Sequence, residues 1–135
     1  MFDLSGRVAF VTGGAGLLGA EFCRTLAEAG AGVAVADINL PAAEKVSKSL
    51  QELGLRSLAV EIDVTSPGSV QQAVARTVEQ FSRLDVLVNS AAIDPKFDPQ
   101  HVDQKPLSGE FEDFPLAAWE QAISVNLTGT FLCCQ

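Results

Sequence analysis

The chain has 135 residues, a length typical of one domain, and 47% of them are hydrophobic, which is enough to bury a core and argues against disorder. Its net charge of −8, with nine scattered Lys and Arg residues, disfavours nucleic acid and anionic membranes as partners. Three cysteines without zinc-ligand spacing, together with the absence of an export signal or a long apolar stretch, predict a cytoplasmic protein that binds no metal.

Near the N-terminus, a predicted strand over 7–12 runs into glycines that open a predicted helix over 17–29. Spaced glycines at this junction permit a tight turn, a close approach of the backbone to a pyrophosphate, and packing of the helix on the strand. A glycine-rich turn without a ligand is the alternative. The residues expected to bind a dinucleotide here are Thr12, Gly13, Gly16, Leu17, Leu18 and Gly19.

A second apolar segment, predicted as a strand over 33–37, ends in Asp37. A carboxylate at this position can accept hydrogen bonds from both ribose hydroxyls of an adenosine. It would repel a 2′-phosphate, so the sequence predicts NAD in preference to NADP. The alternative is that Asp37 only ends the strand and forms a turn with Asn39.

The remaining pattern alternates between helices over 41–53 and 67–82 and strands over 57–63 and 84–89, followed by a long loop and a last helix from Leu116. This alternation predicts an α/β, Rossmann-type doubly wound parallel sheet with strand order 3-2-1-4 and helices on both faces, in one domain over 1–135. Two helices carry apolar residues at core spacing, which are Val70, Ala73, Val74, Val78 and Phe81 in one and Trp119, Ile123, Leu127 and Phe131 in the other.

Four segments together resemble the N-terminal half of the short-chain dehydrogenase/reductases: Thr12–Gly19, Asp63-Val64, Asn89-Ser90-Ala91-Ala92 and Asn126-Leu127-Thr128-Gly129. The resemblance implies that Asp63 and Val64 contact the adenine and that the segment with Asn89, Ala91 and Ala92 lines the ribose. It also implies that Asn126 is the active-site asparagine. Taken singly, Asp63 could form a turn, Asn89 could bridge backbones and Asn126 could be a helix amide with satisfied bonds.

The sequence departs from this family in three respects. Leu17 stands where the shorter branch usually has glycine, and the spacing of Gly13, Gly16 and Gly19 resembles the extended branch, which acts on nucleotide sugars. Ser90 and Ala92 replace the more usual asparagine and glycine. The chain contains no tyrosine, whereas the family transfers a proton with a Tyr-x-x-x-Lys pair. We therefore expect a fragment, truncated before that segment and inactive alone.

These observations predict an NAD-dependent oxidoreductase that transfers hydride between NAD(H) and an alcohol or ketone, with a sugar-like substrate weakly favoured. The alternatives are a non-catalytic NAD-binding module and an extended-type nucleotide-sugar epimerase or dehydratase. The resemblance also implies a homodimer or tetramer with the last helix in the interface. We expect the three cysteines and Trp119 to be core residues, His101 to be a solvated loop residue, and the loop with Phe97, Phe111 and Phe114 to set specificity.

Overall fold

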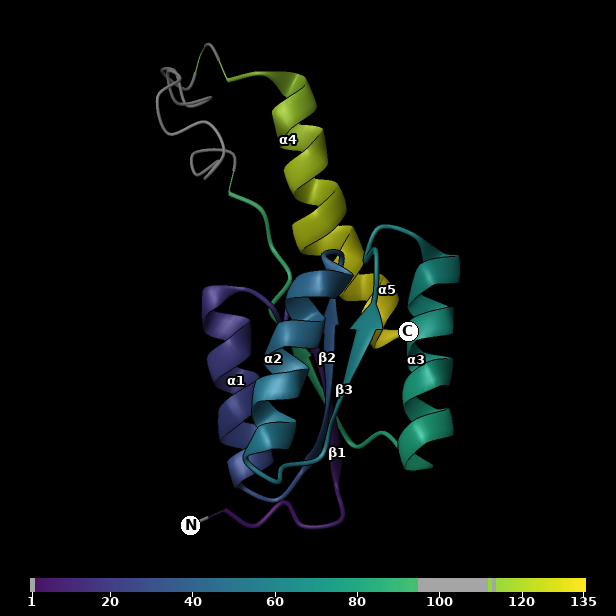
Figure 1. Cartoon of the computed structure of the whole chain (residues 1–135). Coiled ribbons are helices and arrows are strands. Elements are labelled where there is room, and N and C mark those ends of the chain that lie inside the picture. The colour runs from purple at the N-terminus through teal and green to yellow at the C-terminus, as the bar shows by residue number, and fades with distance from the viewer. Residues whose placement is uncertain (1, 95–111, 113) are drawn as a thin grey trace.

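The computed structural model describes residues 2–94, 112 and 114–135, and its centre is a parallel sheet of four strands (Figure 1). The strands are β1 (Val8–Thr12), β2 (Gly32–Asp37), β3 (Ser57–Glu61) and β4 (Val86–Asn89). Their order is β3-β2-β1-β4, which confirms the predicted topology. The predictions for Phe97, His101 and Phe111 lie outside the described residues.

Helices cover both faces of this sheet, which gives three layers (Figure 1). Helices α1 (Leu17–Glu28) and α2 (Leu40–Glu52) pack on one face, around a core that includes Val11 and Val35. Helix α3 (Pro67–Phe81) packs on the other face, around a core that includes Phe10 and Val60. Every residue of β1 is buried, because a parallel sheet with helices on both sides leaves its central strands no contact with water.

Capping residues in the sequence account for where α2 and α3 begin. The side chain of Asn39 accepts a hydrogen bond from the amide of Ala42, and the side chain of Ser66 accepts one from the amide of Ser69. Each cap is followed by a proline in the first turn, where its missing N–H is not needed. No helix among the described residues has the length and apolar character needed to cross a membrane.

The C-terminal helix is not the single regular helix that the apolar spacing predicts. It consists of α4 (Leu116–Ile123), a π-helical segment η2 (Ser124–Gly129) and α5 (Thr130–Cys134). Short π-helical segments are frequent at functional sites and have no simple sequence signature. Gly129 allows this helix to approach the loop after β3, because a Cβ at Gly129 would lie only 2.7 Å from Cγ2 of Val64.

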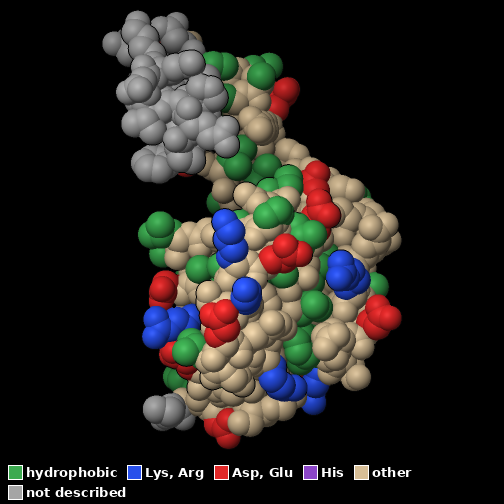
Figure 2. All heavy atoms as spheres, in the orientation of Figure 1, with side chains coloured by type: hydrophobic (Ala, Val, Ile, Leu, Met, Phe, Trp, Pro, Cys, Tyr) green, Lys and Arg blue, Asp and Glu red, His purple; other side chains and the backbone are tan. Residues whose placement is uncertain are grey.

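Several predicted core positions are wrong. Trp119 is 56% exposed, and its stripe partners Leu127 and Phe131 are exposed to a similar extent. Hydrophobic side chains are accordingly visible along α4, in the upper part of Figure 2. In α3, Val78 is exposed, and Thr77 is buried with its hydroxyl donating to the carbonyl of Ala73. The helical period identified an apolar face correctly, but other described residues do not cover that face on α4–α5.

The three cysteines differ in their surroundings. Cys23 is buried in the core as expected, and burial raises the pKa of its thiol to about 12. Cys133 is half-buried and packs against the core on the α3 side of the sheet. Cys134 is exposed, which contradicts the expected packing, and its sulfur accepts a 3.5 Å hydrogen bond from Nδ2 of Asn89.

The carboxylate of Asp85, which the sequence analysis did not select, joins the amino-terminal ends of β1 and β4. Asp85 accepts hydrogen bonds from Nε and Nη2 of Arg83, from Nη1 of Arg7 and from the amide of Val8, at 2.6–3.0 Å. The hydrogen bonds from Arg83 are the main reason why the pKa of Asp85 lies well below its ordinary value. The network therefore favours the ionised carboxylate.

Replacing Asp85 by Asn should lower the melting temperature at pH 7. Because folding depresses the pKa of Asp85, its stabilisation is complete above the unfolded pKa of about 3.9 and is lost as the pH falls toward the folded value. The difference in melting temperature between wild type and Asp85→Asn should thus shrink as the pH is lowered from 5 to 2. Thermal unfolding followed by circular dichroism tests this, and a difference independent of pH would contradict it.

Candidate functional site

The loop between β1 and α1 and the first turn of α1 contain three glycines at which a side chain would meet neighbouring atoms. Gly13 has φ +64°, and a Cβ there would lie 2.8 Å from the backbone of Ala91. A Cβ at Gly19 would collide with the carbonyl oxygen of Gly13. The sequence reading overlooked Gly14, where a Cβ would lie 2.9 Å from Cγ1 of Val35. The glycines thus pack the start of α1 against the ends of β1 and β2.

The first turn of α1 has free amide groups. Its N-cap is Gly16, which provides no side-chain cap, whereas α2 and α3 are capped by Asn39 and Ser66. The amides of the first helical turn have no intrahelical acceptors, and with the helix dipole they form a site that favours an anion.

Thr12 joins the end of β1 to the segment after β4. Its hydroxyl oxygen accepts hydrogen bonds from the amides of Ser90 and Ala91, both at 3.1 Å, and lies 3.5 Å from the carbonyl of Val88. Thr12 is only 1% exposed, so its hydroxyl has no access to water as an alternative partner. Thr12 therefore fixes one wall of the site through its side chain.

We expect Thr12→Val to lower the free energy of unfolding by about 1–3 kcal/mol, because two partly buried amides lose their acceptor. Thr12→Ser keeps the hydroxyl and removes one methyl group, so it should cost only about 1 kcal/mol. Urea unfolding of both variants measures the difference. Equal stability of the two variants would show that the hydroxyl does not fix this segment.

Asp37 connects the end of β2 to the glycine loop. One carboxylate oxygen accepts from the amide of Ala15 at 3.0 Å, and the other accepts from the amide of Asn39 at 2.9 Å. The turn between Asp37 and Asn39, which the sequence analysis gave as the alternative to ribose binding, is thus present. The carboxylate remains partly exposed, and each oxygen has a further lone pair with which it can accept a ligand hydroxyl.

A cleft of about 260 Å³ lies at the carboxyl ends of the strands, beside the crossover point between β1 and β4. This is where ligands bind in open parallel sheets. None of the described residues that line this cleft is basic. They are Gly13, Gly16, Asp37, Ile38, Ile62, Asp63, Val64, Ser90, Ala91, Ala92, Ile93 and Val125.

Asp63 holds a carboxylate at one end of the cleft. One of its oxygens, Oδ1, accepts from the amide of Thr65 at 2.9 Å and from its hydroxyl at 2.6 Å. These hydrogen bonds lower the pKa of Asp63, so the group is ionised at neutral pH. The expected turn after β3 is therefore present, and it leaves Oδ2 free to accept from a ligand.

Asn126 lies in the π-helical segment, and its side chain binds a residue that lines the cleft. Its Oδ1 accepts from the amide of Ile93 at 2.9 Å, and its Nδ2 donates to the carbonyl of the same residue at 3.0 Å. Its own carbonyl accepts from the hydroxyl of Thr130. The side chain thus fixes Ile93, which lines the cleft, by two hydrogen bonds.

Some of the predicted site residues do not line the cleft. The side chains of Leu17 and Leu18 are 92% and 68% exposed at the start of α1. The groups that these residues can offer to a ligand are therefore the backbone amides of the uncapped first turn. Asn89 directs its amide to Cys134. Thr12 and Gly19 act by shaping the walls. The sequence reading did not select Ile38, Ile62, Ser90, Ile93 or Val125 as binding residues, although each follows or lies near a residue that it did select.

Comparison with known protein sequences places this arrangement in a family. The family model described as short chain dehydrogenase matches residues 7–135. Similar proteins include cis-4-hydroxycyclohexanecarboxylate dehydrogenase of Sinomonas cyclohexanicum, 39% identical, with 94% of this chain and 46% of that protein aligned. D-threitol dehydrogenase of Mycolicibacterium smegmatis is 34% identical, with 99% of this chain and 47% of that protein aligned.

Solved structures agree with these relatives. A hydroxysteroid dehydrogenase from Escherichia coli superposes with a TM-score of 0.81 at 30% identity, over 98% of this chain and 51% of its own. A 7α-hydroxysteroid dehydrogenase complexed with NADH and 7-oxo glycochenodeoxycholic acid gives the same TM-score and identity, over 98% and 47% of the two chains. The chain spans about half the length of these relatives. It belongs to the short-chain dehydrogenase family, whose members are NAD(P)-binding oxidoreductases.

Proposed function

We propose that this chain binds NAD in the cleft and forms the cofactor-binding domain of an oxidoreductase that acts on an alcohol or ketone, with a sugar-like compound as the favoured substrate. The observation that carries the proposal is the convergence of the glycine loop, the Asp37 carboxylate and the Asp63 carboxylate on one cleft whose described lining residues include no basic side chain. The relatives named above, which act on hydroxyl-bearing compounds according to their names, support the oxidoreductase class.

The described residues suit a dinucleotide along the whole cleft. The uncapped first turn of α1, with the amides of Leu17, Leu18 and Gly19, would bind the pyrophosphate. Asp37 would accept from the adenosine ribose and Asp63 from the adenine, with Val64 beside it. The segment Ala91–Ala92, which follows Asn89 in the sequence, would line the second ribose of the dinucleotide.

NAD, when bound, supplies the carbon that accepts or donates hydride. In this proposal Asn126 belongs to the active site because it fixes Ile93, and with it the wall of the cleft beyond Ala92. Because the sequence contains no tyrosine, these residues are assigned the binding and orientation of the cofactor and not the proton transfer at the substrate oxygen.

Isothermal titration of the 135-residue chain with NAD and with NADP tests the proposal. NAD should bind, and NADP should bind at least about tenfold more weakly, because its 2′-phosphate would meet the carboxylate of Asp37. Equal or tighter binding of NADP would refute the assigned preference. If neither dinucleotide binds, the proposed function itself is wrong.

The exposed stripe on α4–α5 is proposed as a homodimer interface. It comprises Leu116, Trp119, Ile123, Leu127 and Phe131, which are 37–69% exposed in this chain. An apolar surface of this kind is typical of a site that another protein surface covers. The family resemblance favours a second copy of the chain as that surface.

Leu127→Glu should therefore reduce self-association of the chain by at least about tenfold, since it places a charge in a desolvated contact. Sedimentation equilibrium measures the dissociation constant. Leu53→Glu, at an equally exposed position at the end of α2, is the matched control and should leave association unchanged. A wild-type chain that stays monomeric at high concentration would refute this interface.

A further inference from the structure

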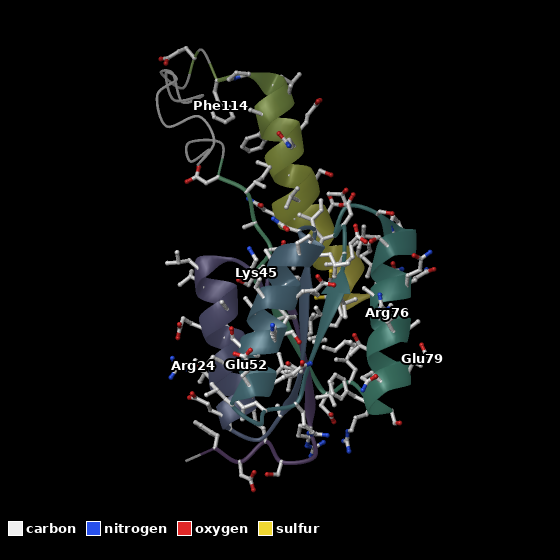
Figure 3. The ribbon with its side chains drawn as sticks, viewed as in Figure 1. Arg24, Lys45, Glu52, Arg76, Glu79 and Phe114 are labelled. Atoms are coloured by element: carbon white, nitrogen blue, oxygen red, sulfur yellow. The ribbon has the colours of Figure 1, made fainter. Side chains whose placement is uncertain are left out.

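The π-helical segment η2 forms part of the cleft from the side of the C-terminal helix. It lies between α4 and α5 in this helix, which begins just after the labelled Phe114 (Figure 3). Val125 of η2 lines the cleft itself, and the side chain of Asn126 makes two hydrogen bonds to the backbone of Ile93, another lining residue. The position of η2 therefore determines part of the wall of the cleft.

The hydroxyl of Thr130 holds the backbone of this segment. Thr130 is the first residue of α5, is only partly exposed, and donates its hydroxyl to the carbonyl of Asn126 at 2.9 Å. In a regular α-helix this carbonyl would accept the amide of residue 130. That amide donates to the carbonyl of Leu127. The side chain of Thr130 thus supplies a donor to a carbonyl whose usual backbone partner bonds elsewhere.

The two ends of η2 are fixed in different ways. Gly129 is buried and lies against Val64, where an added Cβ would come within 2.7 Å of Cγ2, so close packing holds the C-terminal end. Asn126 is exposed and is held by hydrogen bonds, two from its side chain to Ile93 and one from Thr130 to its carbonyl. Because π-helical hydrogen bonds span five residues and α-helical ones span four, a return to α-helical bonding would rotate Asn126 relative to α5 and change its position against Ile93.

We propose that Thr130 is a positioning residue for the bound dinucleotide: its hydroxyl stabilises the π-helical backbone at Asn126, and Asn126 in turn holds Ile93. This rests on the NAD binding proposed above, in which Ala92 lines the second ribose. Ile93 follows Ala92 in the sequence and lines the same cleft, so it is expected beside the nicotinamide half of NAD. Thr130 is not among the described residues that line the cleft, so it acts through Asn126 and Ile93.

The adenosine half of the dinucleotide provides an internal reference. Asp37 and Asp63, the residues assigned to this half, are held by backbone amides and by a hydroxyl that lie outside η2. ADP contains the adenosine and the pyrophosphate but lacks the nicotinamide half. Loss of the Thr130 hydroxyl should therefore weaken the binding of NAD and leave the binding of ADP unchanged.

Titration of Thr130→Val with NAD and with ADP tests the proposal, because valine keeps the branched shape and removes the hydroxyl. The affinity for NAD should fall about three- to tenfold, whereas the affinity for ADP should stay within about twofold of wild type. Thr130→Ser keeps the hydroxyl and should restore the binding of NAD. Thr128→Val is the matched control and should bind both ligands like wild type, because Thr128 is exposed in the same segment and its hydroxyl makes no hydrogen bond within the described ranges.

Amide hydrogen exchange gives a second readout that needs no ligand. The amide of Ile93 donates to Asn126, so it should exchange about fivefold faster in Thr130→Val than in wild type. The amide of Ala91 donates to Thr12 and should exchange as in wild type.

Three results would each overturn the role of Thr130 and leave the NAD site standing. They are an unchanged affinity of Thr130→Val for NAD, an equal loss of NAD and ADP binding, and an Ile93 amide that exchanges as in wild type. A wild-type chain that binds neither ligand would refute the proposed function, and the exchange of Ile93 would then still decide whether Thr130 positions this residue.

Discussion

Gly19→Ala should lower the free energy of unfolding by about 2–3 kcal/mol and abolish measurable binding of NAD. In most helices the change from Gly to Ala is stabilising, by up to about 1 kcal/mol. Here the added Cβ would collide with the carbonyl oxygen of Gly13 and lie 2.9 Å from Cα of Gly14. Both contacts are backbone, so relief requires α1 to move away from the loop that carries its free amides.

Gly68→Ala is the matched control, because Gly68 also lies in a helix but a Cβ there would meet nothing within 4 Å. This variant should be as stable as wild type or up to about 1 kcal/mol more stable. Urea unfolding and titration with NAD measure both effects. If Gly19→Ala and Gly68→Ala behave alike, close packing in the glycine loop is not what fixes the start of α1.

Asp37→Ser should reduce the affinity for NAD by at least about tenfold and remove the preference for NAD over NADP. The variant loses the acceptor for the ribose hydroxyls and also the charge that repels a 2′-phosphate, a repulsion on the order of 1–4 kcal/mol. The amides of Ala15 and Asn39 lose their acceptors as well, so the glycine loop should become less rigid. Titration with both dinucleotides gives the ratio directly.

Glu61→Gln tests whether the preference for NAD depends on the Asp37 carboxylate itself or on negative charge in general. Glu61 is the register partner of Asp37 on β3, and its substitution removes one negative charge from the neighbouring strand. The ratio of NADP to NAD affinity should stay within about twofold of wild type. A change in this ratio as large as that of Asp37→Ser would mean that the overall negative potential, rather than the Asp37 carboxylate, sets the preference.

The parts of the fold that could be predicted from the sequence are those with a local cause. Strands such as Val8–Thr12 are continuous apolar segments, helices begin at caps such as Ser66, and spaced glycines mark the tight loop between β1 and α1. Sheet order followed from the doubly wound topology that the alternation of strands and helices predicts. Most element boundaries therefore differ from the prediction by only one or two residues.

Other features depend on contacts between distant segments and have no local pattern. The hydrogen bonds that Asn126 accepts from Ile93 and Asp85 accepts from Arg7 join residues far apart in the sequence. The π-helical segment arises within a sequence that reads as an ordinary helix. The exposure of Trp119 could not be predicted, because periodicity identifies an apolar face without indicating what covers it.

The polar residues predicted to bind the cofactor or substrate also have the structural roles that the sequence analysis gave as alternatives. Asp37 and Asp63 each form a turn, and the amide of Asn126 has its hydrogen bonds satisfied. A structural role therefore does not count against binding at such a position. What matters is the remaining capacity of the group, such as the unused oxygen of Asp63.

The π-helical segment connects two surfaces of the molecule, the cleft and the exposed stripe on α4–α5. Asn126 holds the cleft residue Ile93, and the next residue, Leu127, belongs to the exposed stripe on the outside of the same turn. A displacement of this turn therefore acts on both surfaces. Thermodynamic linkage then requires reciprocity: if association through Leu127 changes the affinity for the dinucleotide by some factor, the dinucleotide must change association by the same factor.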